Sequence, residues 1–85
     1  MLFLKTKIKG LSGVEIIERI LSYQPMRNYT LPELKSIAYG KYGKYMMETY
    51  ISASIRKLRN PKYGGYTIST SRRKKDKLWY YRMEI

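Results

Sequence analysis

The chain has 85 residues, a length that allows one domain with a modest hydrophobic core and leaves no room for a second domain. Its composition, 44% hydrophobic and 14% aromatic, is that of a folded chain, and 18 Lys and Arg against 6 Asp and Glu give a formal net charge of +12. Such an excess destabilises a compact state by self-repulsion, so it indicates a polyanionic partner, with nucleic acid as the first candidate.

The residues that the chain lacks argue against several functions. It contains no Cys and no His, which excludes disulfides, thiolate zinc sites, thiol nucleophiles and imidazole bases. The six carboxylates are scattered and no P-loop is present, so we expect no enzyme, no metal site and no cofactor. The longest apolar run near the start, MLFL, is too short for a membrane span, and we expect a cytoplasmic or nucleoid-associated protein.

Residues 1–10 (MLFLKTKIKG) show period-2 alternation, with Leu2, Leu4 and Ile8 on one side and lysines on the other. The pattern predicts a short strand or an arm, and a frayed basic terminus fits it equally well. Its apolar start could lie on the domain or form a dimer contact, which leaves both a monomer and a homodimer open. The folded domain itself is expected over residues 11–85.

A first helix is predicted over residues 13–23. Ser12 and Glu15 form an S-x-x-E capping box, in which the hydroxyl and the carboxylate satisfy amide donors of the first turn. Residues at three- and four-residue spacing are expected to form its buried stripe: Val14, Ile17, Ile20 and Leu21, with Ile16 at the margin. The face with Glu15 and Glu18 should point away from a polyanion.

A short strand and a second helix follow. Pro25 interrupts the helical pattern, and residues 27–29 are predicted to form a very short strand. Thr30 and Glu33 repeat the capping box, and Gly40 is expected to end the helix as its left-handed C′ residue. The apolar positions of this helix are Leu31, Leu34, Ile37 and Ala38.

A third helix is predicted from about residue 46 to residue 59, where Asn60 precedes Pro61 and leaves the helical region. Its expected buried stripe contains Met47, Ile51, Ile55 and Leu58, with Tyr50 and Ser54 at the edge. Its other side carries Glu48, Thr49, Ser52, Arg56 and Arg59. We expect Arg59 to pair with a carboxylate, Glu48 or Glu84, and Arg56 to be free for a partner.

A hairpin is predicted after the turn at Gly64 and Gly65. A polar strand, YTISTS, and an aromatic strand, LWYYRM, are joined by the run RRKKDK, which holds five cations and one anion. Ile68, Tyr81 and Met83 are expected to face inward over the third helix. A helix that leads into a hairpin with a cationic tip fits a groove beside phosphates. The run could also be a solvated tip or a nuclear localisation signal.

The segment ETYISASIRKLRNPKYGGYTI, from Glu48 to Ile68, followed by YYRM at the end of the chain, resembles small winged helix-turn-helix proteins common in bacteriophages and prophages. Those proteins share an I-[ST]-A-x-[IL]-R-x-L-R segment, a Gly turn, an inward Ile and a closing aromatic-Tyr-Arg-aliphatic strand. The resemblance covers residues 12–85 in layout. It implies an α+β winged helix-turn-helix, with three helices and a C-terminal two-stranded β-hairpin wing.

The resemblance also implies a function, namely binding of double-stranded DNA in phage or mobile-element transcription, replication or excision. The third helix would enter the major groove with Glu48, Thr49, Ser52 and Arg56. The wing would approach the DNA backbone or minor groove with Arg72, Arg73, Lys74, Lys75 and Lys77. Glu48 would then have to accept from a cytosine amine or pair with a neighbouring lysine. Lys41 and Lys44 are expected to help electrostatic capture.

Two alternative functions remain from the sequence. Winged helices also bind RNA, and they also mediate protein contacts, so the chain could be a phage-encoded inhibitor or adaptor that holds an acidic protein. The ten tyrosines could fill the half-buried rim of a small core or stack on bases, and Tyr42, Tyr45 and Tyr80 are the best candidates for stacking. Displacement by bulk duplex DNA would distinguish a DNA binder from an adaptor.

Overall fold

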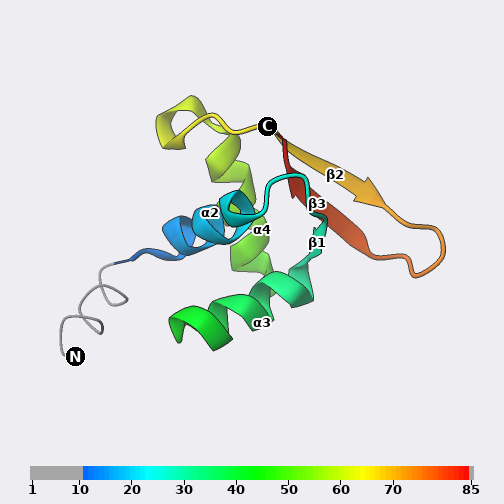
Figure 1. Ribbon diagram of the computed structural model, residues 1–85, viewed down its shortest axis with the longest axis horizontal. Helices are drawn as coiled ribbons and strands as arrows, with labels where there is room; N and C mark the ends of the chain where they lie inside the picture. The colour runs from blue at the N-terminus through cyan, green and yellow to red at the C-terminus, as the bar shows by residue number, and fades with distance from the viewer. Residues whose placement is uncertain (1–10, 85) are drawn as a thin grey trace.

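The computed structural model describes residues 11–84, so the strand or arm predicted at residues 1–10 lies outside the described residues. This part of the chain is α+β, as predicted, and contains three α-helices (Figure 1). The elements in chain order are α2 (Gly13–Tyr23), β1 (Tyr29–Thr30), α3 (Leu31–Tyr42), α4 (Glu48–Arg59), the 3-10 helix η1 (Pro61–Tyr63), β2 (Ile68–Arg72) and β3 (Trp79–Met83).

The sheet has three antiparallel strands in the order β1-β3-β2, which corrects the two-stranded hairpin expected from the sequence. The predicted short strand forms at residues 29–30 and pairs with β3, where Tyr29 lies opposite Tyr81. The reason is burial: the ring of Tyr29 is only 2% exposed, and its place in the core brings the β1 backbone alongside β3. On the other side of β3, Ile68 lies opposite Met83.

Both predicted capping boxes are present. The Ser12 amide donates to Glu15 Oε1 at 2.9 Å and the Glu15 amide donates to Ser12 Oγ at 3.2 Å. Thr30 and Glu33 form the same reciprocal pair at 2.9 and 3.2 Å. These bonds satisfy amide donors that the first helical turn leaves without partners, so α2 and α3 begin where the sequence predicts.

The end of α3 differs from the prediction. Gly40 lies inside the helix, which continues to Tyr42 and ends at Gly43 in the left-handed conformation, with φ 65°. The Gly43 amide donates to the Tyr39 carbonyl oxygen at 3.0 Å, as expected for a C-terminal cap. The extra turn packs the half-buried Tyr42 ring against the core, and this packing favours the later stop.

The start of α4 also differs from the prediction. The helix begins at Glu48, and Met47 is the N-cap residue with a 62% exposed side chain. Met46, one residue earlier, is buried at 4% instead. Because Met47 lies before the first helical turn, the helical period that links Ile51 and Ile55 does not extend back to it.

The core lies where the three helices meet the sheet. It contains Ile16, Ile17, Ile20, Leu21, Tyr29, Leu34, Ala38, Met46, Ile51, Ile55, Leu58, Ile68 and Met83. Ile16 is fully buried and Val14 is only half-buried, the reverse of the expected order, because α2 packs against both α3 and α4 and buries a wider arc than one stripe. Ser54, expected at the edge, is buried and donates to the Tyr50 carbonyl oxygen at 2.9 Å.

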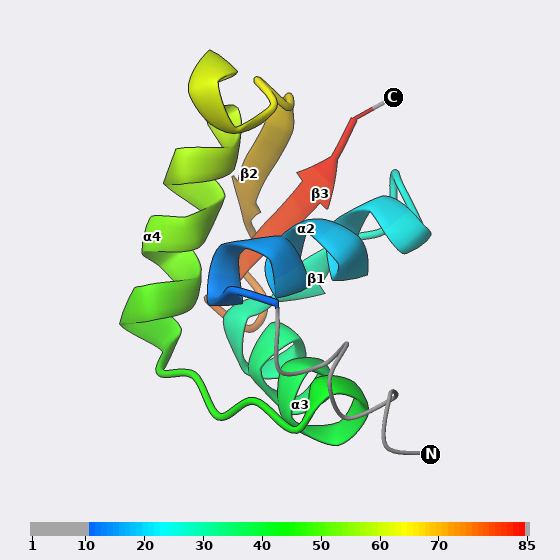
Figure 2. The same cartoon turned by 90° about the vertical axis from the view of Figure 1, so that its left-hand side faces the viewer.

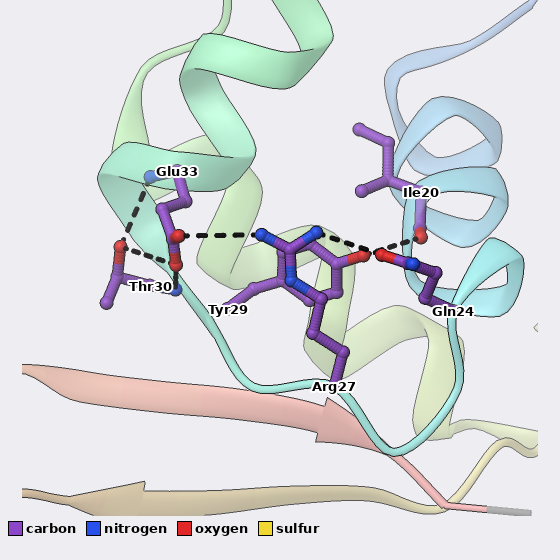
Figure 3. A network of polar contacts seen from close by, with 6 residues as sticks. All are labelled: Ile20, Gln24, Arg27, Tyr29, Thr30 and Glu33. Atoms are coloured by element: carbon purple, nitrogen blue, oxygen red, sulfur yellow. Dashed lines mark hydrogen bonds and ion pairs between the residues drawn. The ribbon is translucent and has the colours of Figure 1, made fainter.

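A polar network joins α2, β1 and α3 (Figure 3). The Tyr29 hydroxyl donates to the carbonyl oxygen of Ile20 at 3.5 Å. Arg27 lies between two elements: its Nη1 donates to Gln24 Oε1 at 2.9 Å, and its Nη2 is 3.8 Å from Glu33 Oε2. The network fixes the segment before β1, which in turn positions the edge of the sheet.

The hairpin β2–β3 extends away from the helices, as Figure 1 shows. Seen after a quarter turn, α4 runs along one side of the molecule, and α3 lies toward the end at which α4 begins (Figure 2). Burial falls along the hairpin, from the buried pair Ile68 and Met83 to the exposed pair Arg72 and Trp79. The far half of the hairpin is therefore open to solvent.

Candidate nucleic-acid interface

The outer side of α4 is polar and exposed. Ile51, Ile55 and Leu58 are buried on the opposite side, so the helical period turns Thr49 and Arg56 toward solvent and leaves Ser52 half-buried. Within residues 11–84 the Arg56 side chain has no hydrogen bond and no ion pair. Its guanidinium is therefore available to a partner outside this part of the chain.

Arg59 connects α4 to the hairpin. Its Nε and Nη2 donate to the carbonyl oxygen of Ile68 at 3.1 and 2.7 Å, and Nη2 also donates to Thr70 Oγ1 at 2.7 Å. The structural role predicted for Arg59 is confirmed, but the expected pairing with Glu48 or Glu84 is wrong. A backbone carbonyl of β2 replaces the carboxylate because α4 ends beside the first residue of that strand.

A hollow of about 260 Å³ lies between α4 and the hairpin. Its lining is Ser52, Ile55, Arg56 and Arg59 from α4, with Thr70, Trp79 and Tyr81 from the hairpin. Ser52 and Arg56, which were predicted to contact nucleobases, thus lie beside the hairpin. The structure brings the polar side of α4 and the inner face of the hairpin together around one concave surface.

The hairpin tip, residues 73–78, is a tight and cationic loop. The Arg73 amide donates to the Leu78 carbonyl oxygen at 3.1 Å, and the Lys77 amide donates to the Arg73 carbonyl oxygen at 2.8 Å. Lys77 takes a left-handed conformation with φ 57° to close the turn. Five exposed cations lie on this tip and the strand end before it: Arg72, Arg73, Lys74, Lys75 and Lys77.

Asp76, the one acid of the tip, is held by local hydrogen bonds. The Tyr80 hydroxyl donates to Asp76 Oδ2 at 2.7 Å and the Leu78 amide donates to Oδ1 at 3.0 Å. The hydroxyl first, and then the amide, hold the pKa of Asp76 below its ordinary range. The same hydrogen bond raises the pKa of Tyr80. The carboxylate therefore organises the loop and takes part in no ion pair within residues 11–84.

Two of the hairpin cations stack on aromatic rings. Arg72 Cζ lies 5.6 Å from the centroid of Trp79, and Arg73 Cζ lies 4.6 Å from the centroid of Tyr80. Trp79 was not among the residues predicted to bind nucleic acid. Its position opposite a cation in the hairpin register was a usable signal, but the depth of its burial could not be read from alternation alone.

The charges of this surface are largely unneutralised within residues 11–84. The ion pairs there are Arg27 with Glu33 at 3.8 Å and Arg82 with Glu84 at 3.0 Å, and neither includes a cation of α4 or of the hairpin tip. Of the acids on α2, Glu15 is bound in its capping box and Glu18 accepts a hydrogen bond from the Tyr66 hydroxyl. The hairpin tip and the outer side of α4 thus form a cationic surface.

The other predicted binding residues lie elsewhere. Lys41 Nζ lies 5.2 Å from the ring centroid of Tyr23, in a hollow of about 610 Å³ between α2 and α3. Lys44 and Tyr45 are exposed in the segment that leads into α4, and Lys35 Nζ lies 5.0 Å from the Tyr45 ring. Tyr45 therefore lies near the N-terminal end of α4, while Lys41 is separated from the α4 and hairpin surface.

Among residues 11–84, no group of three or more Asp and Glu side chains is gathered in a way that could hold a metal ion. No helix in this range is both long enough and apolar enough to cross a membrane.

Comparison of the chain with protein-family models, with curated proteins and with solved structures found no match.

Proposed function

We propose that this protein is a winged helix-turn-helix that binds double-stranded DNA, with α4 in the major groove and the hairpin β2–β3 as the wing on the backbone. One observation carries the proposal: the cations of the hairpin tip and Arg56 of α4 form no ion pair within residues 11–84, and Arg56 lines the hollow between α4 and the hairpin that ends in this tip. A phosphate backbone supplies regularly spaced negative charge that complements such a surface.

Each part of the surface has its own role in this proposal. The lysines of the tip attract the duplex and position the domain without reading sequence, because phosphates are alike along the DNA. Arg56 and Ser52 project from α4 four residues apart, so they lie one above the other on the helix and can meet adjacent base edges. Arg59 holds the hairpin beside the helix, so both parts can bind at once.

We also propose, from the resemblance given above, that the protein acts in transcription, replication or excision in a phage or mobile element. The experiment that tests DNA binding is a fluorescence anisotropy titration with a labelled duplex of random sequence. The affinity of the protein for this duplex should fall steeply between about 50 and 200 mM salt, as expected for several phosphate contacts. Unlabelled bulk duplex should displace the probe.

Two other results would redirect the assignment. If structured RNA displaces the labelled duplex much better than bulk duplex DNA does, the partner is RNA. If no nucleic acid binds at low salt, DNA binding is disproved, and an acidic protein becomes the next candidate partner.

A further inference from the structure

We propose that the hollow between α4 and the hairpin accepts an unpaired nucleobase, stacked on the indole of Trp79. The protein would then favour duplex DNA that adjoins a single strand over a blunt duplex. This inference rests on the proposed DNA binding and adds a ligand to the same surface. It concerns six lining residues in particular: Ser52, Arg56, Arg59, Thr70, Trp79 and Tyr81.

The first support is the exposure of Trp79. It is the sole Trp of the chain, and its side chain is 49% exposed although it lies on the same face of β3 as the buried Met83. Arg59 holds α4 close to β2 at Ile68, and burial then decreases along the hairpin toward Trp79. The indole is therefore an apolar surface that the helices leave uncovered, at the wall of a hollow.

The second support is the chemistry of the other lining residues. Ser52 and Thr70 carry hydroxyls, and Arg56 and Arg59 carry guanidinium groups. Among residues 11–84, no carboxylate lines the hollow. An unpaired base offers a flat face for stacking, an edge with hydrogen-bonding atoms, and a phosphate on either side. Inside a duplex these faces are covered by neighbouring base pairs, and at a blunt end the base edges remain paired, so an unpaired base is the ligand that offers both its face and its edge to the hollow.

The third support is the size of the hollow and a cation beside it. About 260 Å³ is less than the roughly 300 to 1,000 Å³ of sites for drug-sized molecules, and it suits one planar ring system. Arg72 Cζ lies 5.6 Å from the centroid of Trp79, so a cation that can contact a phosphate lies next to the indole.

The test uses the full chain and three DNA ligands with the same duplex: one blunt, one with a short single-stranded tail, and one with an abasic tail of equal length. The abasic tail has the phosphates of the normal tail but no bases. Base stacking contributes about 1 to 3 kcal/mol, so the normal tail should bind about 5 to 150 times more tightly than the blunt duplex. The abasic tail should increase the affinity far less.

Tryptophan fluorescence gives a second readout because Trp79 is the only indole. The normal tail should quench its emission, and the blunt and abasic ligands should change it little. The variant Trp79→Ala should lose the preference for the tail, measured as the ratio of its affinities for the tailed and the blunt duplex, whereas Trp79→Phe should keep most of that preference. Tyr39→Ala, which removes another aromatic ring that is 63% exposed, is the matched control and should behave like the wild type.

The outcomes separate this inference from the proposed function. If the wild type binds all three ligands equally and with the same salt dependence, the hollow takes no base, and duplex binding stands. If Trp79→Ala keeps the preference for the tail, another residue stacks the base and the assignment is wrong. If no ligand with a duplex binds, DNA binding itself is disproved. Circular dichroism of Trp79→Ala and Trp79→Phe ensures that folded proteins are compared.

Discussion

Arg59 of α4 donates two hydrogen bonds to the backbone carbonyl oxygen of Ile68 in β2, from Nε at 3.1 Å and from Nη2 at 2.7 Å. Nη2 also donates to Thr70 Oγ1 at 2.7 Å. The hairpin is also held by Ile68 and Met83, which are buried in the core. Arg59 is therefore one of the contacts that place the two parts of the proposed interface side by side.

We expect Arg59→Ala to lower the free energy of unfolding by roughly 1 to 2 kcal/mol, because hydrogen bonds from a charged donor contribute about that much and the site is partly exposed to water. Arg59→Lys should restore only part of the lost stability, since an ammonium group cannot form the bidentate contact. Urea denaturation measures the loss. The control is Arg56→Ala, which removes a side chain without partners in residues 11–84 and should leave stability unchanged within about 0.5 kcal/mol.

Truncation of the buried side chains of α4 should lower the free energy of unfolding far more. Ile55 and Leu58 are each 1% exposed, so Ile55→Ala or Leu58→Ala is expected to cost about 2 to 4 kcal/mol through lost burial and a residual cavity. For a domain of this size that is a large part of the total stability. Thermal melts should give both variants a much lower melting temperature than Lys57→Ala, a change on the exposed side of the same helix. Unchanged melts would contradict the packing of α4.

Two glycines of α3 should respond to alanine in opposite directions. Gly40 lies within the helix, and a Cβ added there would meet no atom within 4 Å. Gly40→Ala should therefore raise the free energy of unfolding by up to about 1 kcal/mol, because Ala has the higher helix propensity. Gly43 has φ 65°, and Gly43→Ala should destabilise by about 1 to 2 kcal/mol because a Cβ disfavours that conformation. Denaturant midpoints measure both. A reversed order would place the end of α3 at Gly40, as the sequence had predicted.

The hairpin tip should show a defined pH dependence. The Tyr80 hydroxyl lowers the pKa of Asp76, so the stabilisation is complete above the ordinary value of about 3.9 and is lost as pH falls through the lowered pKa. The raised pKa of Tyr80 has the opposite sense: its stabilisation is complete below about pH 10 and is lost as pH rises through the raised pKa. NMR titration of the Leu78 amide follows the acid transition. In Tyr80→Phe the pKa of Asp76 should return toward its ordinary value, and an unchanged pKa would contradict the hydrogen bond.

The sequence predicted the features that short-range interactions determine. Ser12 with Glu15 and Thr30 with Glu33 mark helix starts because each capping box lies within four consecutive residues. The stripe of α4 was correct at Ile51, Ile55 and Leu58 for a similar reason, since it follows the helical period.

Features that depend on tertiary packing were not predicted. Gly40 and Gly43 are both suitable helix stops, and the choice between them depends on how Tyr42 packs against the core. The short strand near residue 29 was predicted, but its pairing with β3 required the burial of Tyr29. The hollow at Trp79 depends on how α4 packs beside the hairpin, to which Arg59 contributes. The fold places Lys41 beside Tyr23, away from α4 and the hairpin, a position that its charge alone did not indicate.

Arg56 should affect which sequence is bound more than it affects binding to bulk DNA. A preferred site is first obtained by enrichment from randomised duplexes. On this site, Arg56→Ala should weaken the binding free energy by about 1 to 3 kcal/mol, the contribution of one bidentate contact to guanine. On random duplex the cost should be much smaller. Titration of both duplexes with both proteins gives the comparison. An equal loss on the two duplexes would assign Arg56 to a phosphate.

The most direct test of the proposed DNA interface is the salt dependence of duplex binding in two doubly neutralised variants. Lys74→Gln with Lys75→Gln removes two charges from the hairpin tip, and Arg19→Gln with Lys41→Gln removes two from the hollow between α2 and α3. At about 0.9 per phosphate contact, the slope of log affinity against log salt should become shallower by roughly 2 in the first variant and stay unchanged in the second. An unchanged slope in the first variant, or an equal change in both, would contradict a DNA interface formed by α4 and the hairpin.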